Sequence, residues 1–199
     1  MKLLIIGASG HGKVVGEIAR LAGYHEIIYF DDDPLRKECG GCPVFGTVDQ
    51  CREVEGDVFV AIGNAKIRQR IMEQYADRNM PVLIHPAAVT AKDISIGRGS
   101  VLMPGAIVNP GSVLGQGVIV NTAASVDHDC TIRDYVHVAV GARLCGKVVV
   151  GERTWLGAGS ILINNLSICG DCMIGAGAVV VRDIAAPGIY YGVPAVWRK

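Results

Sequence analysis

The chain has 199 residues, 19 basic and 19 acidic side chains, 26 glycines and 50% hydrophobic residues. Zero net charge argues against a nucleic-acid partner or an anionic membrane surface, and no run of 18 apolar residues is present to span a bilayer. Seven cysteines, an odd number behind a start that does not read as a secretory signal, indicate reduced thiols and a cytoplasmic location.

The first part of the chain predicts a small Rossmann-like α/β domain. The apolar run Leu3–Ile6 reads as a buried first strand, and apolar residues at helical spacing continue to a stop at Gly23. An amphipathic helix is predicted to reach Met80. The other predicted strands are 26–30, 57–62 and 81–84. Because strand and helix alternate, we expect one domain at 1–85 and another at 86–199.

A glycine-rich segment from Gly7 to Gly12 lies between the first strand and its helix. Such a turn places backbone N–H groups and the positive end of the helix beside an anion. Its glycine order is neither the G-x-G-x-x-G of dinucleotide folds nor that of a P-loop, and turn chemistry alone also explains it. Joined to the second domain, the segment predicts phosphate or diphosphate binding by Gly10, His11 and Gly12.

Two acidic residues, Asp31 and Asp32, end the second predicted strand. Their carboxylates suit hydrogen bonds from ribose or sugar hydroxyls, or from a substrate ammonium group. A solvated turn explains them equally well.

Residues 96–180 carry a repeat of six. Every sixth residue from Ile96 to Val180 is Ile, Leu or Val, fifteen times in succession, and the fifth position is mostly small or β-branched. This period fits neither a helix nor a single strand, so it indicates a larger repeating unit. Short strands joined by tight turns, with three sides per coil of 18 residues, predict a parallel β-helix of about five coils. An inert structural or binding solenoid is the non-enzymatic alternative.

The cysteines include two C-x-x-C motifs, Cys39 to Cys42 and Cys169 to Cys172, which resemble half-sites for zinc. However, Cys130 and Cys172 fall on inward repeat positions, where cysteine serves as a small apolar filler. We therefore predict no metal site.

His128 is the strongest candidate for a catalytic base. It lies at the third, outward position of its hexapeptide, and the residue 18 positions later is Gly146. Residues on successive coils stack about 4.8 Å apart, so this glycine leaves room for a ligand beside the imidazole and exposes an amide N–H. Asp129 follows at once and is placed to orient the ring. His137, nine residues further, also points outward; an ordinary surface residue is the alternative for both histidines.

Several motifs together resemble one family of bacterial hexapeptide-repeat sugar acetyltransferases. That family contains the UDP-4-amino-sugar N-acetyltransferases of bacillosamine synthesis and the sialic acid O-acetyltransferases. The motifs are Gly-Ala-Ser-Gly-His-Gly at the start, Asp31-Asp32, Ile62-Gly63-Asn64, Asn121-Thr122, Val126-Asp127-His128-Asp129-Cys130, His137-Val138-x-Val140-Gly141-Ala142 and Gly192-Val193-Pro194-Ala195.

The resemblance implies a left-handed β-helix, acetyl-CoA as donor, and a homotrimer whose active sites lie between neighbouring solenoids. The family's catalytic His-Glu pair falls on His128-Asp129, where the shorter Asp is a departure. Acetyl-CoA contacts are expected at His137, Gly146, Gly157, Gly175 and Pro194. Contacts to a nucleotide sugar are expected at Gly10, His11, Gly12, Asp31, Asp32, Gly63, Asn64 and Asn121.

The chemistry predicted is direct acetyl transfer to the amino group of a UDP-linked amino sugar, with His128 accepting the proton. The backbone N–H of Gly146 or the side chain of His137 is the candidate oxyanion donor. No Ser or Cys is paired with a base by the repeat, which disfavours a covalent acyl-enzyme. The O-acetylation of sialic acid or another sugar is the main alternative.

Other classes explain fewer residues. A carbonic-anhydrase-like site would need His85, His128 and His137 to meet at one metal. Acetylation of serine or small xenobiotics would leave the Rossmann-like domain unexplained, and a scaffold would need no His-Asp pair. The sequence leaves open the identity of the sugar and of the nucleotide.

Overall fold

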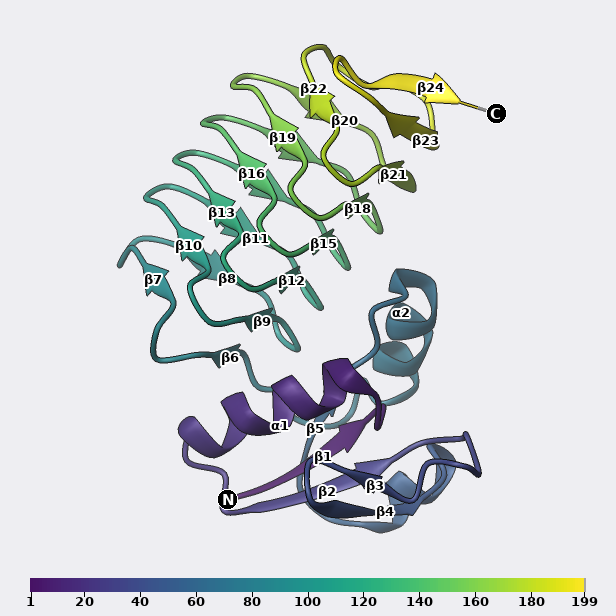
Figure 1. Cartoon of the computed structure of the whole chain (residues 1–199). Helices are drawn as coiled ribbons and strands as arrows, with labels where there is room; N and C mark the ends of the chain where they lie inside the picture. The colour runs from purple at the N-terminus through teal and green to yellow at the C-terminus, as the bar shows by residue number, and fades with distance from the viewer. Residues whose placement is uncertain (199) are drawn as a thin grey trace.

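The computed structural model describes residues 1–198 and shows an α/β unit beneath a three-sided solenoid (Figure 1). The predicted order, a Rossmann-like domain followed by a left-handed parallel β-helix, is confirmed. Among the described residues, no helix is both long enough and apolar enough to cross a membrane.

The N-terminal sheet has five strands in the order β3-β4-β2-β1-β5. Apolar β1 lies between β2 and β5 and is completely buried from Leu3 to Ile6. Neighbouring strands run parallel except in the β3–β4 hairpin. The strands are β1 (Lys2–Ile6), β2 (Glu26–Phe30), β3 (Glu38–Cys39), β4 (Cys42–Gly46) and β5 (Asp57–Val60).

The first C-x-x-C motif is the turn of this hairpin. Gly40 and Gly41 both have positive φ, as a two-residue hairpin turn requires, and Cys39 pairs with Cys42 across the strands. The hairpin and the short 3-10 helix η1 (Asp49–Glu53) were not predicted, because neither is long enough to show an apolar period.

Two helices cover the sheet, α1 (Gly10–Leu21) and α2 (Ala65–Gln74). Helix α1 begins at Gly10, so the predicted glycine loop is half loop and half first helical turn. Helix α2 ends at Gln74 and does not reach Met80 as predicted. The chain instead turns back toward the sheet, where the carbonyl of Asn79 accepts a hydrogen bond from the Val58 N–H at 2.9 Å.

The solenoid consists of three parallel sheets that we name I, II and III. Sheet I contains β6, β9, β12, β15, β18 and β21, sheet II contains β7, β10, β13, β16, β19 and β22, and sheet III contains β8, β11, β14, β17 and β20. Their bounds are β6 (Leu83–Ile84), β7 (Val89–Thr90), β8 (Ser95–Ile96), β9 (Val101–Leu102), β10 (Ile107–Val108), β11 (Val113–Leu114), β12 (Ile119–Val120), β13 (Ser125–Val126), β14 (Thr131–Ile132), β15 (His137–Val138), β16 (Arg143–Leu144), β17 (Val149–Val150), β18 (Trp155–Leu156), β19 (Ile161–Leu162), β20 (Ser167–Ile168), β21 (Cys172–Ile174) and β22 (Val179–Val180).

The rungs confirm the predicted coil of 18 residues. Val120 pairs with Val138, and Val138 with Leu156, and all three side chains are fully buried. Cys130 and Cys172 are buried inside the solenoid as the predicted small fillers.

The solenoid begins earlier than its aliphatic repeat. Leu83 in β6 pairs with Val101 in β9, so the predicted strand 81–84 is the first rung of sheet I and not part of the N-terminal sheet. Leu83, Val101 and Ile119 turn outward on sheet I and are buried under α1. The two parts therefore share one apolar interface. The domain division at residue 85 stays a prediction.

A hairpin closes the upper end of the solenoid (Figure 1). Strand β23 (Gly188–Tyr191) extends sheet I beside β21, and β24 (Val196–Arg198) runs antiparallel to it. Such terminal caps protect the last coil of a repeat structure.

Candidate active site

His128 lies in the turn between β13 of sheet II and β14 of sheet III. Val126 and Cys130 on either side are fully buried and anchor the turn, while Asp129 takes the left-handed conformation (φ 59°) that reverses the chain. About half of the His128 side chain is exposed. The turn thus presents the imidazole on a fixed backbone, as the hexapeptide position predicts.

The two aspartates that flank His128 in the sequence both hydrogen-bond to it. The Nδ1 atom of His128 lies 2.8 Å from Oδ2 of Asp129. The backbone N–H of His128 donates to Oδ1 of Asp127 at 2.8 Å, and that same oxygen accepts from Asn109 on the coil below, also at 2.8 Å. The Asn109 amide, together with the His128 N–H, holds the pKa of Asp127 below its usual value. The hydrogen bond to Asp129 selects the tautomer whose Nε2 is free to accept a proton.

Gly146 stacks directly above the His128 ring, as the spacing of 18 predicts. A Cβ atom built on Gly146 would lie 2.5 Å from Nε2 of His128, far inside contact distance. The backbone N–H of Gly146 donates no hydrogen bond within the described residues. This corner of the solenoid therefore combines an imidazole, a carboxylate and a backbone N–H that donates to no described residue.

His137 belongs to a different group of residues, on sheet I. Its Nε2 lies 3.1 Å from Nδ2 of Asn121, whose Oδ1 accepts the Thr122 N–H. The Asn121 amide therefore donates, and Nε2 of His137 accepts and carries no proton. Burial, then the charge of Arg68 and the neighbouring His11, lower the pKa of His137 to about 3.

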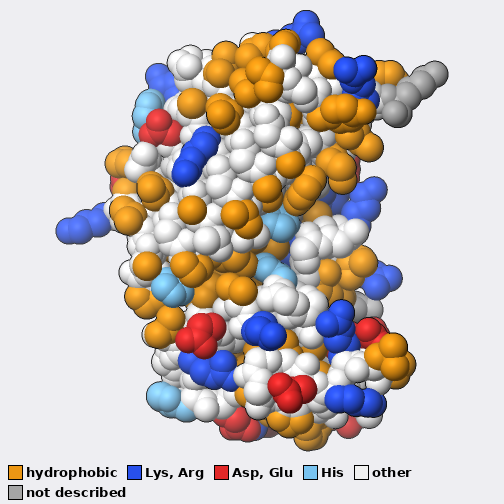
Figure 2. Space-filling view, viewed as in Figure 1, with side chains coloured by type: hydrophobic (Ala, Val, Ile, Leu, Met, Phe, Trp, Pro, Cys, Tyr) orange, Lys and Arg blue, Asp and Glu red, His pale blue; other side chains and the backbone are white. Residues whose placement is uncertain are grey.

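His11 packs against His137 from helix α1, with ring centroids 6.4 Å apart. Its Nε2 is buried and has no hydrogen-bond partner within the described chain. Burial and the charge of Arg68 lower the pKa of His11 to about 4, so both rings are neutral near pH 7. A buried nitrogen without a partner costs free energy, so this atom is a polar group available for a ligand contact. Figure 2 shows histidine side chains gathered where the solenoid meets the α/β unit.

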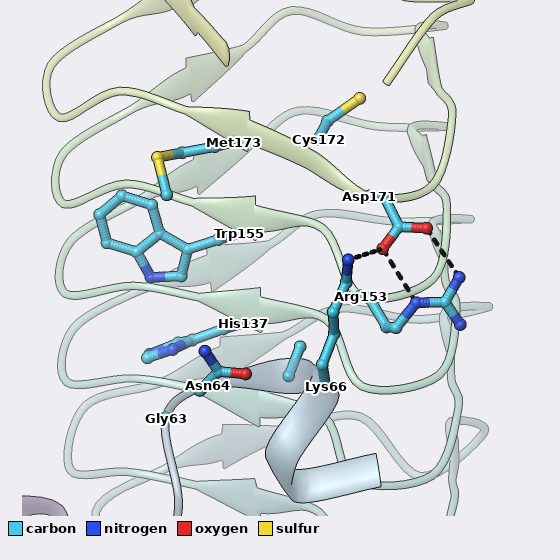
Figure 3. A pocket seen from close by; sticks show the side chains of 10 residues that line it. Gly63, Asn64, Lys66, His137, Arg153, Trp155, Asp171, Cys172 and Met173 are labelled. Carbon is cyan, nitrogen blue, oxygen red and sulfur yellow. Dashed lines mark hydrogen bonds and ion pairs between the residues drawn. The ribbon is translucent and has the colours of Figure 1, made fainter. Parts of the chain in front are cut away.

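A cavity of about 470 Å³ lies beside His137, between sheet I and the start of α2 (Figure 3). Asn64 caps α2 by accepting the Ile67 N–H at 3.1 Å. Trp155 and Met173 form an apolar side of the cavity, and Arg153 and Asp171 form a charged side. The side chains that line the cavity include Asn64, Lys66, His137, Arg153, Trp155 and Met173.

The glycine loop is shaped by close contacts. A Cβ on Gly12 would lie 2.0 Å from the Gly7 carbonyl oxygen, so the loop folds back on the helix only with glycine there. Nothing lies within 4 Å of the Cβ direction of Gly10. The N-cap Ser9 makes no side-chain cap, and the first turn of α1 holds no acidic residue, so its N–H groups are open to an anion.

The two predicted aspartates have structural partners. Asp31 Oδ2 accepts the Ala8 N–H of the glycine loop at 2.7 Å, and Asp32 Oδ1 accepts the Val48 N–H at 2.9 Å. Asp31 thus fixes the position of the glycine loop by binding its backbone. Direct contact of either carboxylate with a sugar stays a prediction.

Three predicted acetyl-CoA residues lie at the upper coils. Cβ atoms on Gly157 and Gly175 would lie 2.5 Å from the Ile174 carbonyl and 2.6 Å from Tyr191 Cβ. Close stacking of this chain thus explains why glycine is needed at both positions. Pro194 lies in the turn between β23 and β24. Their roles toward acetyl-CoA stay predictions.

Within one chain the two groups are separated by the solenoid. His128 and Gly146 lie at the corner between sheets II and III, and this corner is opposite sheet I in the triangular section. His137, His11 and Gly63 lie on the sheet I side. Within one chain, the structure therefore places His137 beside the expected sugar-binding residues, and its role toward acetyl-CoA stays a prediction.

Comparison with known proteins identifies the family. Residues 2–75 match the family described as PglD N-terminal domain. A GDP-perosamine N-acetyltransferase of Escherichia coli O157:H7 is 31% identical over 168 residues, which cover 79% of this chain and 76% of that protein. The chain belongs to the bacterial sugar N-acetyltransferase family. Its predicted class, an acyltransferase, is confirmed.

Two further relatives of this sugar N-acetyltransferase extend the comparison. The acetyltransferase domain of PglB from Neisseria gonorrhoeae FA1090, solved in complex with acetyl coenzyme A, superposes with a TM-score of 0.95 at 43% identity and covers 99% of this chain and 98% of that one. A UDP-N-acetylbacillosamine N-acetyltransferase of Bacillus subtilis (strain 168) is 33% identical over 107 residues, half of each chain.

Sequence reasoning missed the sheet I wall of this acetyltransferase's cavity. Trp155 and Met173 follow His137 at intervals of 18 and stack above it in register. The same coil arithmetic that selected Gly146 would have found this column. Lys66 and Arg68 carried no comparable signal, because only the docking of α2 on the solenoid places them there. Among residues 1–198, no three His, Cys, Asp or Glu side chains gather as metal ligands.

Proposed function

We propose that this enzyme transfers the acetyl group of acetyl-CoA to the amino group of a UDP-linked amino sugar, with His128 as general base. The observation that carries the proposal is the corner at His128: Asp129 binds Nδ1, and the ring fits only because Gly146, against which Nε2 lies, has no side chain. A base with one nitrogen fixed and the other open suits proton removal from an attacking amine.

The reaction needs no covalent enzyme intermediate. The amine nitrogen attacks the thioester carbonyl and its proton passes to Nε2 of His128. The C–S bond then breaks, and the CoA thiolate receives that proton. Holding both substrates in one cleft makes the attack effectively unimolecular. Asp129 stabilises the ring while it is positively charged.

The Gly146 N–H is the proposed oxyanion donor. It has no partner within the described residues and lies beside His128. A preorganised backbone donor stabilises the charge that develops on the thioester oxygen.

We propose a homotrimer with each site shared by two subunits. The sugar-binding residues lie on the sheet I side and His128 at the opposite corner, so one chain does not bring them together. A neighbour related by threefold symmetry would place its His128 corner against sheet I. Light scattering should give three times the 21.0 kDa chain mass. A monomer at assay concentration would contradict the shared site.

The α/β unit is proposed to bind the nucleotide diphosphate. The open N-terminus of α1 at Gly10–Gly12 supports this role, and so does the buried Nε2 of His11, which has no hydrogen-bond partner among the described residues. The named relatives act on both kinds of nucleotide sugar, so a GDP-linked amino sugar is the alternative acceptor.

Product inhibition tests the proposal. UDP should compete with the sugar substrate and not with acetyl-CoA, and it should inhibit at lower concentration than GDP. Stronger competition by GDP would assign the acceptor to the GDP-linked class. If neither nucleotide competes, the proposed diphosphate site is wrong.

A further inference from the structure

Arg68 is a buried cation at the junction of the α/β unit and the solenoid. Its side chain, on helix α2, is 0% exposed. Among the described residues no carboxylate lies within 4.0 Å of its guanidinium. The charge is thus buried without a counter-ion. Such burial is costly unless hydrogen bonds within the protein replace those that the guanidinium makes to water.

The guanidinium joins three separate segments. Nε donates to the Gly117 carbonyl at 2.8 Å, and Nη2 donates to the Tyr135 carbonyl at 2.6 Å. These carbonyls belong to equivalent turns of two successive coils. Nη1 donates to the carbonyls of Ile62 and Gly63 at 2.7 and 2.9 Å. One side chain therefore sets the position of the loop that precedes α2 relative to the solenoid.

That loop borders the cavity beside His137. A Cβ on Gly63 would lie 4.0 Å from Cε1 of His137, and Asn64 follows as a lining residue. Four bonds to carbonyls fix direction as well as distance, because the guanidinium is planar and its donors form a rigid fork. An apolar side chain would pack there, but it would not hold the loop.

We propose that Arg68 is a positioning residue of the nucleotide-sugar half of the site, which fixes the Gly63–Asn64 loop against His137. The assignment of this half to the sugar rests on the proposed function. Its charge also contributes to the lowered pKa of His11 and His137, which agrees with a neutral, hydrogen-bonding surface there.

The kinetic test compares Arg68 with a matched arginine. Arg78 also donates to two carbonyls, those of Val54 and Gly56 at 2.6 and 2.9 Å, but only within the α/β unit. Arg68→Met should raise KM for the nucleotide sugar about tenfold or more and leave KM for acetyl-CoA within about twofold. Arg68→Lys should recover only part of the loss, and Arg78→Met should change neither KM.

A second readout needs no substrate. The chain has five histidines, so their Cε1–H signals are resolvable by NMR. In Arg68→Met the His137 signal should shift while that of His128, at the far corner, stays in place. Should Arg68→Met fail to fold, Arg68→Lys and Arg68→Gln allow the same comparison. Equal changes in both KM values, or an unmoved His137 signal, would overturn the positioning role. A shifted His137 signal in an enzyme that rejects every nucleotide sugar would instead refute the proposed function alone.

Discussion

Replacing Gly146 with alanine tests the proposed base by sterics alone. The φ angle of Gly146 lies outside the left-handed region, so alanine fits the backbone. Its Cβ would lie 2.5 Å from Nε2, 2.6 Å from Cε1 and 3.1 Å from Cδ2 of His128, whereas ordinary contact begins at 3.4 Å. The ring must therefore move by about 1 Å. A shift of that size in a catalytic group lowers the rate on the order of 10²-fold.

Stability should change little in the same variant. His128 is half exposed and its ring is free to swing into solvent, so we expect the free energy of unfolding to stay within about 1 kcal/mol of the parent. Gly170→Ala is the matched control, because Gly170 holds the same repeat position at another corner and its Cβ would meet no His ring, only Glu152, whose carbonyl oxygen lies at 3.1 Å and Cγ at 3.3 Å. This control should keep near-parental activity.

The assay is steady-state acetyl transfer, followed by thiol release, together with urea unfolding. Gly146→Ala should lower kcat/KM by about 10–100-fold. In a His128→Ala background the same substitution should have almost no further effect, because the two act as one unit. A fully active Gly146→Ala enzyme, or additive losses in the double variant, would refute the role of the ring above this glycine.

Three other substitutions or conditions give further predictions. His128→Ala should lower kcat by about 10²–10⁴-fold with an unchanged circular dichroism spectrum, and retention of most activity would remove His128 as the base. Asp129→Asn should cause a smaller loss in the same assay, since it weakens orientation but keeps the base; a loss as large as that of His128→Ala would contradict this division of roles. His11 and His137, with folded pKa values of about 4 and 3 against 6.5 unfolded, take up protons on unfolding once the pH falls below about 6.5. Stability should then fall by about 1.4 kcal/mol per pH unit for each ring, measured by urea unfolding at pH 6.5 and 5.0, and His137→Gln should reduce the slope. An identical slope in His137→Gln would show that this ring is not held neutral.

The repeat made the solenoid predictable and also located the His128 corner. A strict period of six fixes which residues point inward and which residues stack, so the contact of His128 with Gly146 followed from counting. The start of the solenoid was missed because Leu83 faces outward under α1 and lies before the aliphatic series. The aliphatic repeat predicts which residues fill the core of the solenoid. It carries no signal for residues that pack between the solenoid and the α/β unit.

The sheet I half of the site shows the same limit. The repeat predicts that His137 faces outward, but it carries no sign that His11 and Gly63 of the α/β unit lie beside it. Asp31 was correctly placed at the end of its strand, but its bond to Ala8 depends on how the glycine loop folds. Arg68 was not noticed at all, because its role comes from the docking of α2 against two coils.

Product analysis with a panel of nucleotide sugars tests the central claim most directly. The enzyme would be incubated with acetyl-CoA and, separately, UDP- and GDP-linked amino sugars, their hydroxyl counterparts, and sialic acid, while thiol release and product mass are recorded. We predict a product that gains one acetyl group on nitrogen, formed fastest from a UDP-linked amino sugar and absent with His128→Ala. Faster acetylation of sialic acid or of a hydroxyl sugar than of any nucleotide amino sugar would contradict the proposed function.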